Sequence, residues 1–223
     1  MSDILHRQTL SAIGRRLYRK GFVAGTDGNL SCRLDSDKIL ITASGTALGF
    51  LAEGDFVVLN PAGEILTGRK APSSEYLMHL AVYRARHDVM ACCHAHPPFA
   101  TARATAGKGL PSGILPEIVA FVGDIPLADY APPGTEAVPK SVAGYLADHQ
   151  AFLLRSHGVL TIGRNMEEAY NRMEAVEHYA KIIYIADHSG GAIPLEEEEI
   201  QRLREIGRSL KSGQLTDDKE NNS

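Results

Sequence analysis

The sequence has few cysteines and no long apolar run. Cys32, Cys92 and Cys93 are an odd number, and neighbouring Cys92 and Cys93 point to opposite faces if their segment is a strand. We therefore expect buried thiols that pack as small hydrophobic groups, not a disulfide framework. No run approaches the roughly 18 apolar residues that span a bilayer, and the N-terminus lacks the apolar core of a signal peptide. These absences predict a cytoplasmic protein with no membrane partner.

The sequence also lacks an excess of positive charge. Its 23 basic and 27 acidic residues give a net charge of -4, so no general field attracts nucleic acid, and any phosphate binding must be local. With 223 residues, 44% hydrophobic and 22% charged, the chain is typical of a compact globular protein. Since there is no internal repeat or long linker, we expect one domain over residues 1–211 and a polar, mobile tail over residues 212–223.

Hydrophobic periodicity predicts helices that alternate with strands. Helices are expected from residue 3 to near residue 21, from Ser73 and Ser74 onward, and over residues 99–106 and 137–149. The clearest helix carries one apolar stripe of Ala169, Met173, Val176, Ala180 and Ile183. Strands are expected at residues 38–42, 55–59, 90–96, 151–155 and 159–162, the last two joined by a tight turn at His157 and Gly158.

The segment from Cys93 to Pro97 contains two histidines, His94 and His96, in a strand context. Strand periodicity places both imidazoles on one face of a sheet. Two neutral imidazoles suit a divalent transition metal, because each supplies a nitrogen lone pair without adding charge. On its own this pair is also consistent with surface hydrogen bonding or core packing.

Two further residues are candidate ligands. His157 lies between two apolar strands, where a tight turn can aim it into a cleft, although it can also be an ordinary turn histidine. Glu75 lies in the first turn of a predicted helix, where a carboxylate can reach a metal or a substrate proton, or simply favour the positive helix end. Three histidines and a carboxylate make a tetrahedral set, or leave an open position if the carboxylate moves away to act as a base.

A second cluster has the composition of a phosphate site. Ser73 and Ser74 precede a helix whose first backbone N–H groups are free to bind an anion. Residues 25–29 and 42–46 are small, polar turns that can complete such a cradle. Each of these segments alone is also consistent with a simple turn or cap.

Taken together, these motifs resemble the class II aldolase/adducin family, and most closely its L-fuculose-1-phosphate aldolase branch. The matching motifs occur in the family's order and span about residues 5 to 190. They are Gly-Thr-Asp-Gly-Asn-Leu-Ser at 25–31, Ile-Thr-Ala-Ser-Gly at 41–45, Pro-Ser-Ser-Glu at 72–75, His-Ala-His at 94–96 and Ser-His-Gly at 156–158.

The resemblance implies a single three-layer α/β domain with a central, mainly antiparallel sheet flanked by helices. It also implies a homotetramer with active sites at subunit interfaces, and one metal ion per subunit, zinc or alternatively Mn²⁺ or Co²⁺. In the family the positions of His94, His96 and His157 bind this metal, and Glu75 matches a carboxylate that is both ligand and acid/base. The family positions that hold the substrate phosphate or shape its loop match Thr26, Gly28, Asn29, Ser44, Gly45, Ser73 and Ser74.

The activity that the resemblance implies is aldol cleavage. A ketose 1-phosphate would be split between C3 and C4 into dihydroxyacetone phosphate and an aldehyde. The fuculose enzymes carry an interfacial tyrosine just after an Ile-Pro pair, whereas here Leu115-Pro116 is followed by Glu117. Glu117 is therefore either the candidate for a second acid/base or an ordinary solvated carboxylate in a turn. Without that tyrosine, 5-deoxyribulose or 5-methylthioribulose 1-phosphate fits as well as fuculose phosphate.

Three other functions occur in or near the family. Ribulose-phosphate 4-epimerases typically carry aspartate where this chain has Glu75. A related dehydratase places a glutamate near the position of Glu117. An adducin-like structural role keeps the fold without catalysis, and the retention of all three histidines and Glu75 argues against it.

Overall fold

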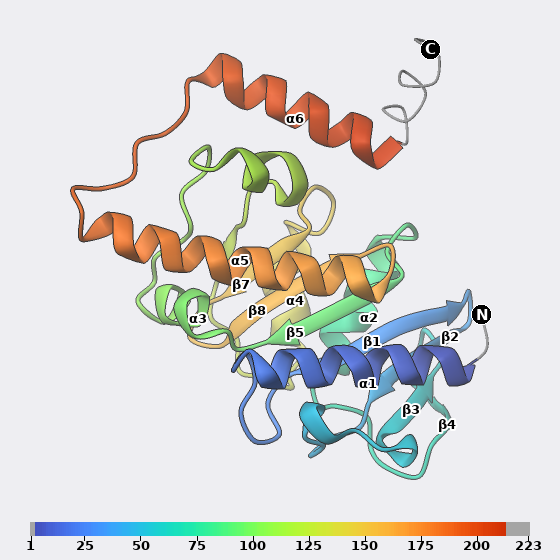
Figure 1. Ribbon diagram of the computed structural model, residues 1–223. Helices are drawn as coiled ribbons and strands as arrows, with labels where there is room; N and C mark the ends of the chain where they lie inside the picture. The colour runs from blue at the N-terminus through green and yellow to red at the C-terminus, as the bar shows by residue number, and fades with distance from the viewer. Residues whose placement is uncertain (1–2, 213–223) are drawn as a thin grey trace, which may run out of the picture.

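The structure is a computed structural model that describes residues 3–212, and its centre is an eight-stranded sheet (Figure 1). The strands lie in the order β4-β3-β2-β1-β5-β8-β7-β6. They are β1 (Asn29–Asp35), β2 (Lys38–Thr42), β3 (Phe56–Leu59), β4 (Ile65–Thr67), β5 (Ala91–Ala95), β6 (Leu127–Ala128), β7 (Ala151–Leu154) and β8 (Gly158–Gly163). Within the described residues, the β6–β7 pair is parallel and the other neighbouring pairs are antiparallel. The expected mainly antiparallel sheet is confirmed.

Helices cover both faces of this sheet. They are α1 (Asp3–Arg19), α2 (Tyr76–Ala85), α3 (Pro98–Thr105), α4 (Ala137–Ala143), α5 (Met166–Asp187) and α6 (Glu197–Ser212), with short helical turns η1 (Leu48–Phe50) and η2 (Glu53–Asp55) and a π-helix η3 (Ile118–Val122). Helices α1, α3 and α5 share one hydrophobic core with one face of the sheet, and α2 and α4 share a second core with the other face. Figure 1 shows α1 and α5 lying across the same face. The expected three layers are confirmed.

Strand β5 lies near the middle of the sheet and contributes to both cores. Cys93 packs with the core of α1, α3 and α5, and Cys92 packs with the core of α2 and α4. The predicted opposite orientation of these thiols is therefore confirmed, and burial raises the pKa of Cys92 to about 12. Because alternate residues of β5 face alternate layers, His94 lies on the same face as Cys92, beside α2.

Helix α5 follows the periodic stripe that the sequence predicts. Its stripe from Ala169 to Ile183 is buried against the sheet, and the Asn165 side chain accepts a hydrogen bond from Glu168 N at 2.8 Å as the N-cap. Helix α6 packs through Ile200 and Leu203 onto Val119 of η3. Residues 213–223, most of the expected mobile tail, lie outside the described residues. None of the helices within residues 3–212 is long and apolar enough to cross a membrane.

Several predicted elements differ from the observed ones. Strands β1, β4 and β6 were not predicted, and the helix expected over residues 137–149 ends at Ala143, where Gly144 follows as its C-cap. Helix α2 begins at Tyr76, and Glu75 is its N-cap residue, not part of its first turn. The turn between β7 and β8 comprises residues 155–157, because Gly158 already pairs with Leu154 in the sheet.

Candidate metal centre

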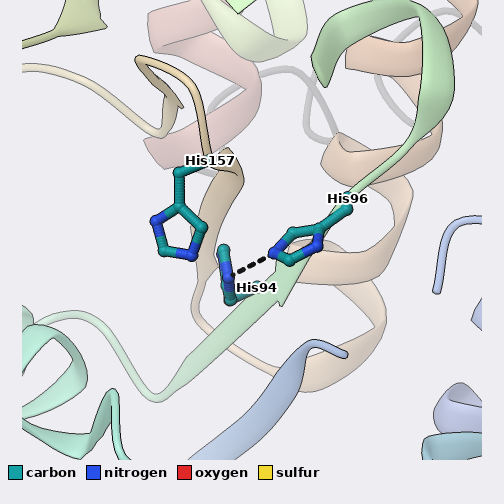
Figure 2. Close-up of side chains that lie close together, drawn as sticks. All are labelled: His94, His96 and His157. Carbon is teal, nitrogen blue, oxygen red and sulfur yellow. Dashed lines mark hydrogen bonds between the residues drawn. The ribbon is translucent and has the colours of Figure 1, made fainter. Parts of the chain in front are cut away.

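Three histidines converge at the ends of two neighbouring strands. His94 lies on β5, His96 follows its last residue, and His157 ends the turn that leads into β8. Figure 2 shows the three imidazoles pointing toward one another, and a potential metal-binding atom from each lies within 4.8 Å of those of the other two. The structure thus brings together the three histidines that the sequence singles out.

The backbone around this cluster makes room for it. Ser156 adopts a φ of 53°, a left-handed conformation that is unfavourable for a residue other than glycine, and this turn directs His157 toward β5. A Cβ atom at Gly158 would lie 2.4 Å from His96 Cδ2 and 2.6 Å from the Ala95 carbonyl oxygen. Only glycine at this position allows the rings to approach as closely as they do.

The carboxylate of Glu75 lies between two of the histidines. Its Oε2 is 3.0 Å from His94 Nε2, and its Oε1 is 3.0 Å from His157 Nε2. Glu75 is buried on the α2 side of the sheet, at the N-cap of that helix, but its side chain does not cap the helix. The fourth predicted ligand therefore lies beside the predicted trio.

The ionisation of these groups is set by their mutual contact. Burial alone favours the neutral acid, but the charge of His94 and hydrogen bonds from His157 and His94 outweigh it and hold the pKa of Glu75 well below its usual range. Burial likewise opposes a charge on His94, yet the Glu75 carboxylate raises the pKa of His94. Burial and the charges of His94 and His157 lower the pKa of His96 to about 4. Glu75 is thus ionised at neutral pH, as a ligand or base must be.

Hydrogen bonds orient the histidine rings. His94 Nδ1 lies 2.9 Å from the Val159 carbonyl oxygen, which can only accept, so Nδ1 carries a proton and Nε2 faces the cluster. His96 Nδ1 lies 3.6 Å from Asp27 Oδ2, which leaves its Nε2 facing the cluster as well. Carbonyl and carboxylate groups behind ligating imidazoles are common in metal sites.

The donor set fits zinc. His94 Nε2 and His96 Nε2 are 3.2 Å apart, and the Nε2 atoms of His94 and His157 are each 3.0 Å from a Glu75 oxygen. Two nitrogen ligands about 2.0 Å from one tetrahedral ion are separated by about 3.3 Å, which is close to these values. Three nitrogens and one carboxylate also match the ligands that zinc takes in catalytic sites.

The candidate phosphate residues form two neighbouring turns and a third segment beside Glu75. Ala43 pairs with Pro72 in an isolated bridge, Ser44 N donates to Ala71 O at 2.9 Å, and Ser73 N donates to Thr42 O at 3.1 Å. The turn that contains Ser44 and Gly45 is therefore adjacent to the segment of Ser73 and Ser74. The third segment holds Thr26 and Gly28. A Cβ atom at Gly28 would lie 2.8 Å from the His94 carbonyl oxygen, so this segment passes close to the backbone of β5.

Asn29 and Glu117 have surroundings that the sequence does not predict. Asn29 is buried at the start of β1, and its Nδ2 donates to Glu75 Oε2 at 2.9 Å. Glu117 is exposed at the N-cap of η3, and within residues 3–212 it makes no polar contact with Glu75 or the three histidines. Sequence reasoning missed Asp27 as a neighbour of His96, although it lies within the glycine-rich turn that was singled out.

Comparisons with known proteins agree with this geometry. The profile described as Class II Aldolase and Adducin N-terminal domain matches residues 8–184. A 3-oxo-tetronate 4-phosphate decarboxylase from Escherichia coli is 36% identical over 184 residues, 80% of this chain and 86% of that protein. A 5-deoxy-D-ribulose 1-phosphate aldolase from Bacillus thuringiensis is 32% identical over 199 residues, 88% of this chain and 92% of that protein. A solved structure of an L-fuculose 1-phosphate aldolase superposes with a TM-score of 0.86 at 33% identity, covering 92% and 97% of the two chains.

Proposed function

Since the chain belongs to the class II aldolase and adducin family, we propose that it is a metal-dependent lyase acting on a sugar phosphate. It breaks the bond between the carbon next to the carbonyl group and the carbon beyond it. The observation that carries the proposal is the position of Glu75, whose ionised carboxylate lies 3.0 Å from both His94 and His157. An acid/base beside the residues that would hold a metal would be placed to move a proton at a carbon next to the carbonyl group of a substrate bound there.

The metal that we propose is zinc, one ion per subunit, with Mn²⁺ or Co²⁺ as alternatives. His94, His96 and His157 would hold it, with Glu75 as a fourth ligand in the free enzyme. When bound, a divalent metal supplies Lewis-acid stabilisation of the negative charge that develops as the carbon–carbon bond breaks. This chemistry needs no covalent adduct with a lysine of the chain.

The first substrate class that we propose is a ketose 1-phosphate resembling fuculose, 5-deoxyribulose or 5-methylthioribulose 1-phosphate. The C3–C4 bond breaks, its electron pair stays on C3, and the C4 hydroxyl loses its proton as the aldehyde forms. The C4 hydroxyl proton passes to Glu117 or to solvent, and Glu75, once it has taken up a proton from solvent, delivers it to C3, which yields dihydroxyacetone phosphate. In the direction of synthesis the ionised Glu75 removes the same proton from C3. The turns of Ser44 and Ser73 would bind the phosphate through their hydroxyl groups and through backbone N–H groups other than those of Ser44 and Ser73, which already donate to Ala71 and Thr42.

Glu117 is the proposed acid/base for the aldehyde oxygen, and this role depends on assembly. The Glu117 side chain is exposed at the N-cap of η3, and within residues 3–212 it takes no part in the polar contacts of the three histidines. We therefore propose a cytoplasmic homotetramer in which active sites lie at subunit interfaces and Glu117 reaches the site of a neighbouring copy. Glu117→Gln should then impair aldol cleavage without affecting proton exchange into dihydroxyacetone phosphate, which needs no aldehyde.

A second candidate function is decarboxylation of a 3-oxo sugar-acid phosphate. Two observations favour it: the similarity to a 3-oxo-tetronate 4-phosphate decarboxylase, and the lack of the tyrosine that would act on a departing aldehyde. In such a substrate the C1–C2 bond breaks, CO2 departs and the electron pair stays on C2. Glu75, once it has taken up a proton from solvent, protonates C2 to give dihydroxyacetone phosphate. Since CO2 needs no proton transfer as it leaves, the reaction requires Glu75 but no second acid/base.

Product analysis tests both functions. Purified, zinc-loaded protein is incubated with the three ketose 1-phosphates and with 3-oxo-tetronate 4-phosphate, and products are identified by mass with coupled detection of dihydroxyacetone phosphate. Dihydroxyacetone phosphate with an aldehyde supports the aldolase, and with CO2 the decarboxylase. Release of water and a diketone phosphate would indicate the dehydratase instead, and inversion at C4 the epimerase. No turnover of any substrate, in protein that retains no metal, would support the adducin-like role.

A further inference from the structure

Strand β1 and the segment of Glu75 and α2 are joined by a row of side-chain contacts that runs away from the metal centre. On β1 the row uses alternate residues, which share one face of the strand. On the helix side it uses every fourth residue, which share one stripe. The members of this row, which we call the β1–α2 ladder, are Asn29, Ser31 and Arg33 on the strand, and Glu75, His79 and Tyr83 on the helix side.

Asn29 and Ser31 are the two strand members of the ladder that lie closest to the candidate metal centre. Asn29 Nδ2 donates to Glu75 Oε2 at 2.9 Å. Two residues along the strand, Ser31 Oγ lies 2.6 Å from His79 Nδ1 and 2.8 Å from the Tyr83 hydroxyl. The Ser31 hydroxyl therefore contacts two successive turns of α2, at His79 and Tyr83, and so ties this helix to β1.

The ladder stays in register because the two elements have matching repeats. Two residues of a strand advance by about 6.7 Å, and four residues of a helix advance by about 6 Å. The strand and the helix run in the same direction, so Arg33 is level with Tyr83, whose carbonyl oxygen accepts a hydrogen bond from Arg33 Nη2 at 2.5 Å. A slip of α2 by one turn would move Glu75 by about 5.4 Å, out of reach of the histidines.

The middle of the ladder is an unusual place for polar groups. Ser31 and His79 are both 0% exposed, and His79 Nε2 has no hydrogen-bond partner among the described residues. Burial and the charge of His94 lower the pKa of His79 to about 3, so its imidazole is neutral. An unpaired buried nitrogen destabilises the folded state, so stability alone would favour an apolar side chain here. A hydrogen-bonded pair can fix one register of α2 against β1, because the bond is directional, whereas an apolar pair cannot.

We propose that Ser31 and His79 are positioning residues that fix the register of α2 against β1 and thereby hold the Glu75 carboxylate between His94 and His157. This role rests on the proposed function of Glu75 as acid/base. Ser31 and His79 do not themselves touch the substrate. Removing their contact should leave the histidines and the phosphate turns in place but allow the carboxylate to move.

The experiment compares Ser31→Ala and His79→Leu with Thr161→Val. Thr161 is an equally buried strand residue whose hydroxyl donates to Ala169 O at 2.7 Å, on the face of the sheet away from α2. In metal-free protein, ¹⁵N NMR of the His94 and His157 rings reports their hydrogen bonds to Glu75 without substrate or metal. We expect both Nε2 signals to shift in Ser31→Ala and His79→Leu and to stay unchanged in Thr161→Val.

Steady-state kinetics of the zinc-loaded enzyme provides the second readout. Loss of a group that orients an active-site ligand typically costs about 10–100-fold, and we expect a fall of that size in kcat with KM within about threefold of wild type. His79→Asn, which keeps a polar atom near the position of Nδ1, should restore most of kcat and the ring signals. Should Ser31→Ala or His79→Leu fail to fold, Tyr83→Phe, which removes one of the two contacts of the Ser31 hydroxyl, carries the same NMR comparison, and its ring signals should shift.

Unchanged His94 and His157 signals in folded ladder variants would overturn the proposal, as would signals that shift equally in Thr161→Val. A wild-type chain with no lyase activity would contradict the proposed function, but the NMR comparison would still decide whether the ladder positions Glu75. The two failures are therefore distinguishable.

Discussion

Asn29 donates a hydrogen bond from its side-chain amide to Glu75 Oε2 at 2.9 Å. The family resemblance assigns Asn29 to the substrate phosphate, yet in this chain its amide contacts Glu75, the proposed acid/base, and its side chain is buried. The two roles predict different effects of substituting Asn29. Loss of a phosphate ligand weakens substrate binding, whereas loss of a partner of Glu75 lowers turnover.

Asn29→Ala and Ser73→Ala should therefore differ in their kinetics. We expect Ser73→Ala to raise KM for the phosphorylated substrate, with little effect on activity toward the unphosphorylated sugar. Asn29→Ala should in addition lower kcat by about tenfold, because Glu75 loses a donor. Parallel measurement on both sugars separates these effects, and identical kinetic profiles for the two variants would show that Asn29 acts through the phosphate alone.

The three histidines should hold the metal. Replacement of His94 or His96 by alanine removes one of three nitrogen ligands, so we expect both metal retention and activity to be lost. The metal content of dialysed protein, measured by elemental analysis, is the test. His87→Ala, at an exposed histidine outside the cluster, is the matched control and should retain the metal. Full occupancy in the His94 variant would remove that residue from the ligand set.

Glu75 should be required for proton transfer. Glu75→Gln keeps the shape of the side chain but cannot accept a proton, so turnover should fall by about two to four orders of magnitude. The direct measurement is exchange of solvent deuterium into dihydroxyacetone phosphate, followed by NMR. Phosphate binding should persist in the variant, and exchange at the wild-type rate would assign the proton transfer to another group.

His79 should make the protein less stable in acid. Its pKa is lowered to about 3 in the folded chain, from an ordinary value of 6.5 in the unfolded chain. As the pH falls below 6.5, the unfolded chain takes up a proton that the folded chain does not, so stability is lost until the pH reaches about 3. Relative to His79→Asn, the wild-type free energy of unfolding should fall by up to about 1.4 kcal/mol per pH unit in this window.

Urea unfolding of both metal-free proteins between pH 4 and pH 7 measures that difference. Above pH 7 the two free energies of unfolding should keep a constant difference, because the imidazole is then neutral in both states. Parallel pH profiles of the two proteins below pH 6 would mean that His79 is protonated in the folded chain.

The sequence predicts the site better than it predicts the path of the chain around it. Periodicity identifies α5, and the motifs identify His94, His96, His157 and Glu75, because ligands must be particular residue types at particular spacings. Strand β1 was overlooked, although residues 29–35 alternate between polar and apolar side chains. Its first two polar residues, Asn29 and Ser31, are buried, which runs against the usual pattern, and their partners at Glu75 and on α2 explain why.

Other features depend on contacts between distant segments and leave no local signal. Strands β4 and β6 have three and two residues, too few to show a period, and exist because β3 and β7 offer them free edges. The hydrogen bond from Asn29 to Glu75 joins residues 46 positions apart. A sequence motif can state that both residues matter, but the contact between them requires the fold.

Gly158 gives the proposed metal centre a vulnerability that none of its candidate ligands reveals. The space that a methyl group would fill there is already occupied by the ring of His96 and the carbonyl group of Ala95. A relative could therefore carry every histidine and the glutamate and still be unable to gather them around an ion, if a larger residue replaced this glycine. A search for the three histidines and the glutamate alone would identify that protein as an enzyme. The residue at the position of Gly158 would show that it is not, because only a hydrogen atom fits there as a side chain.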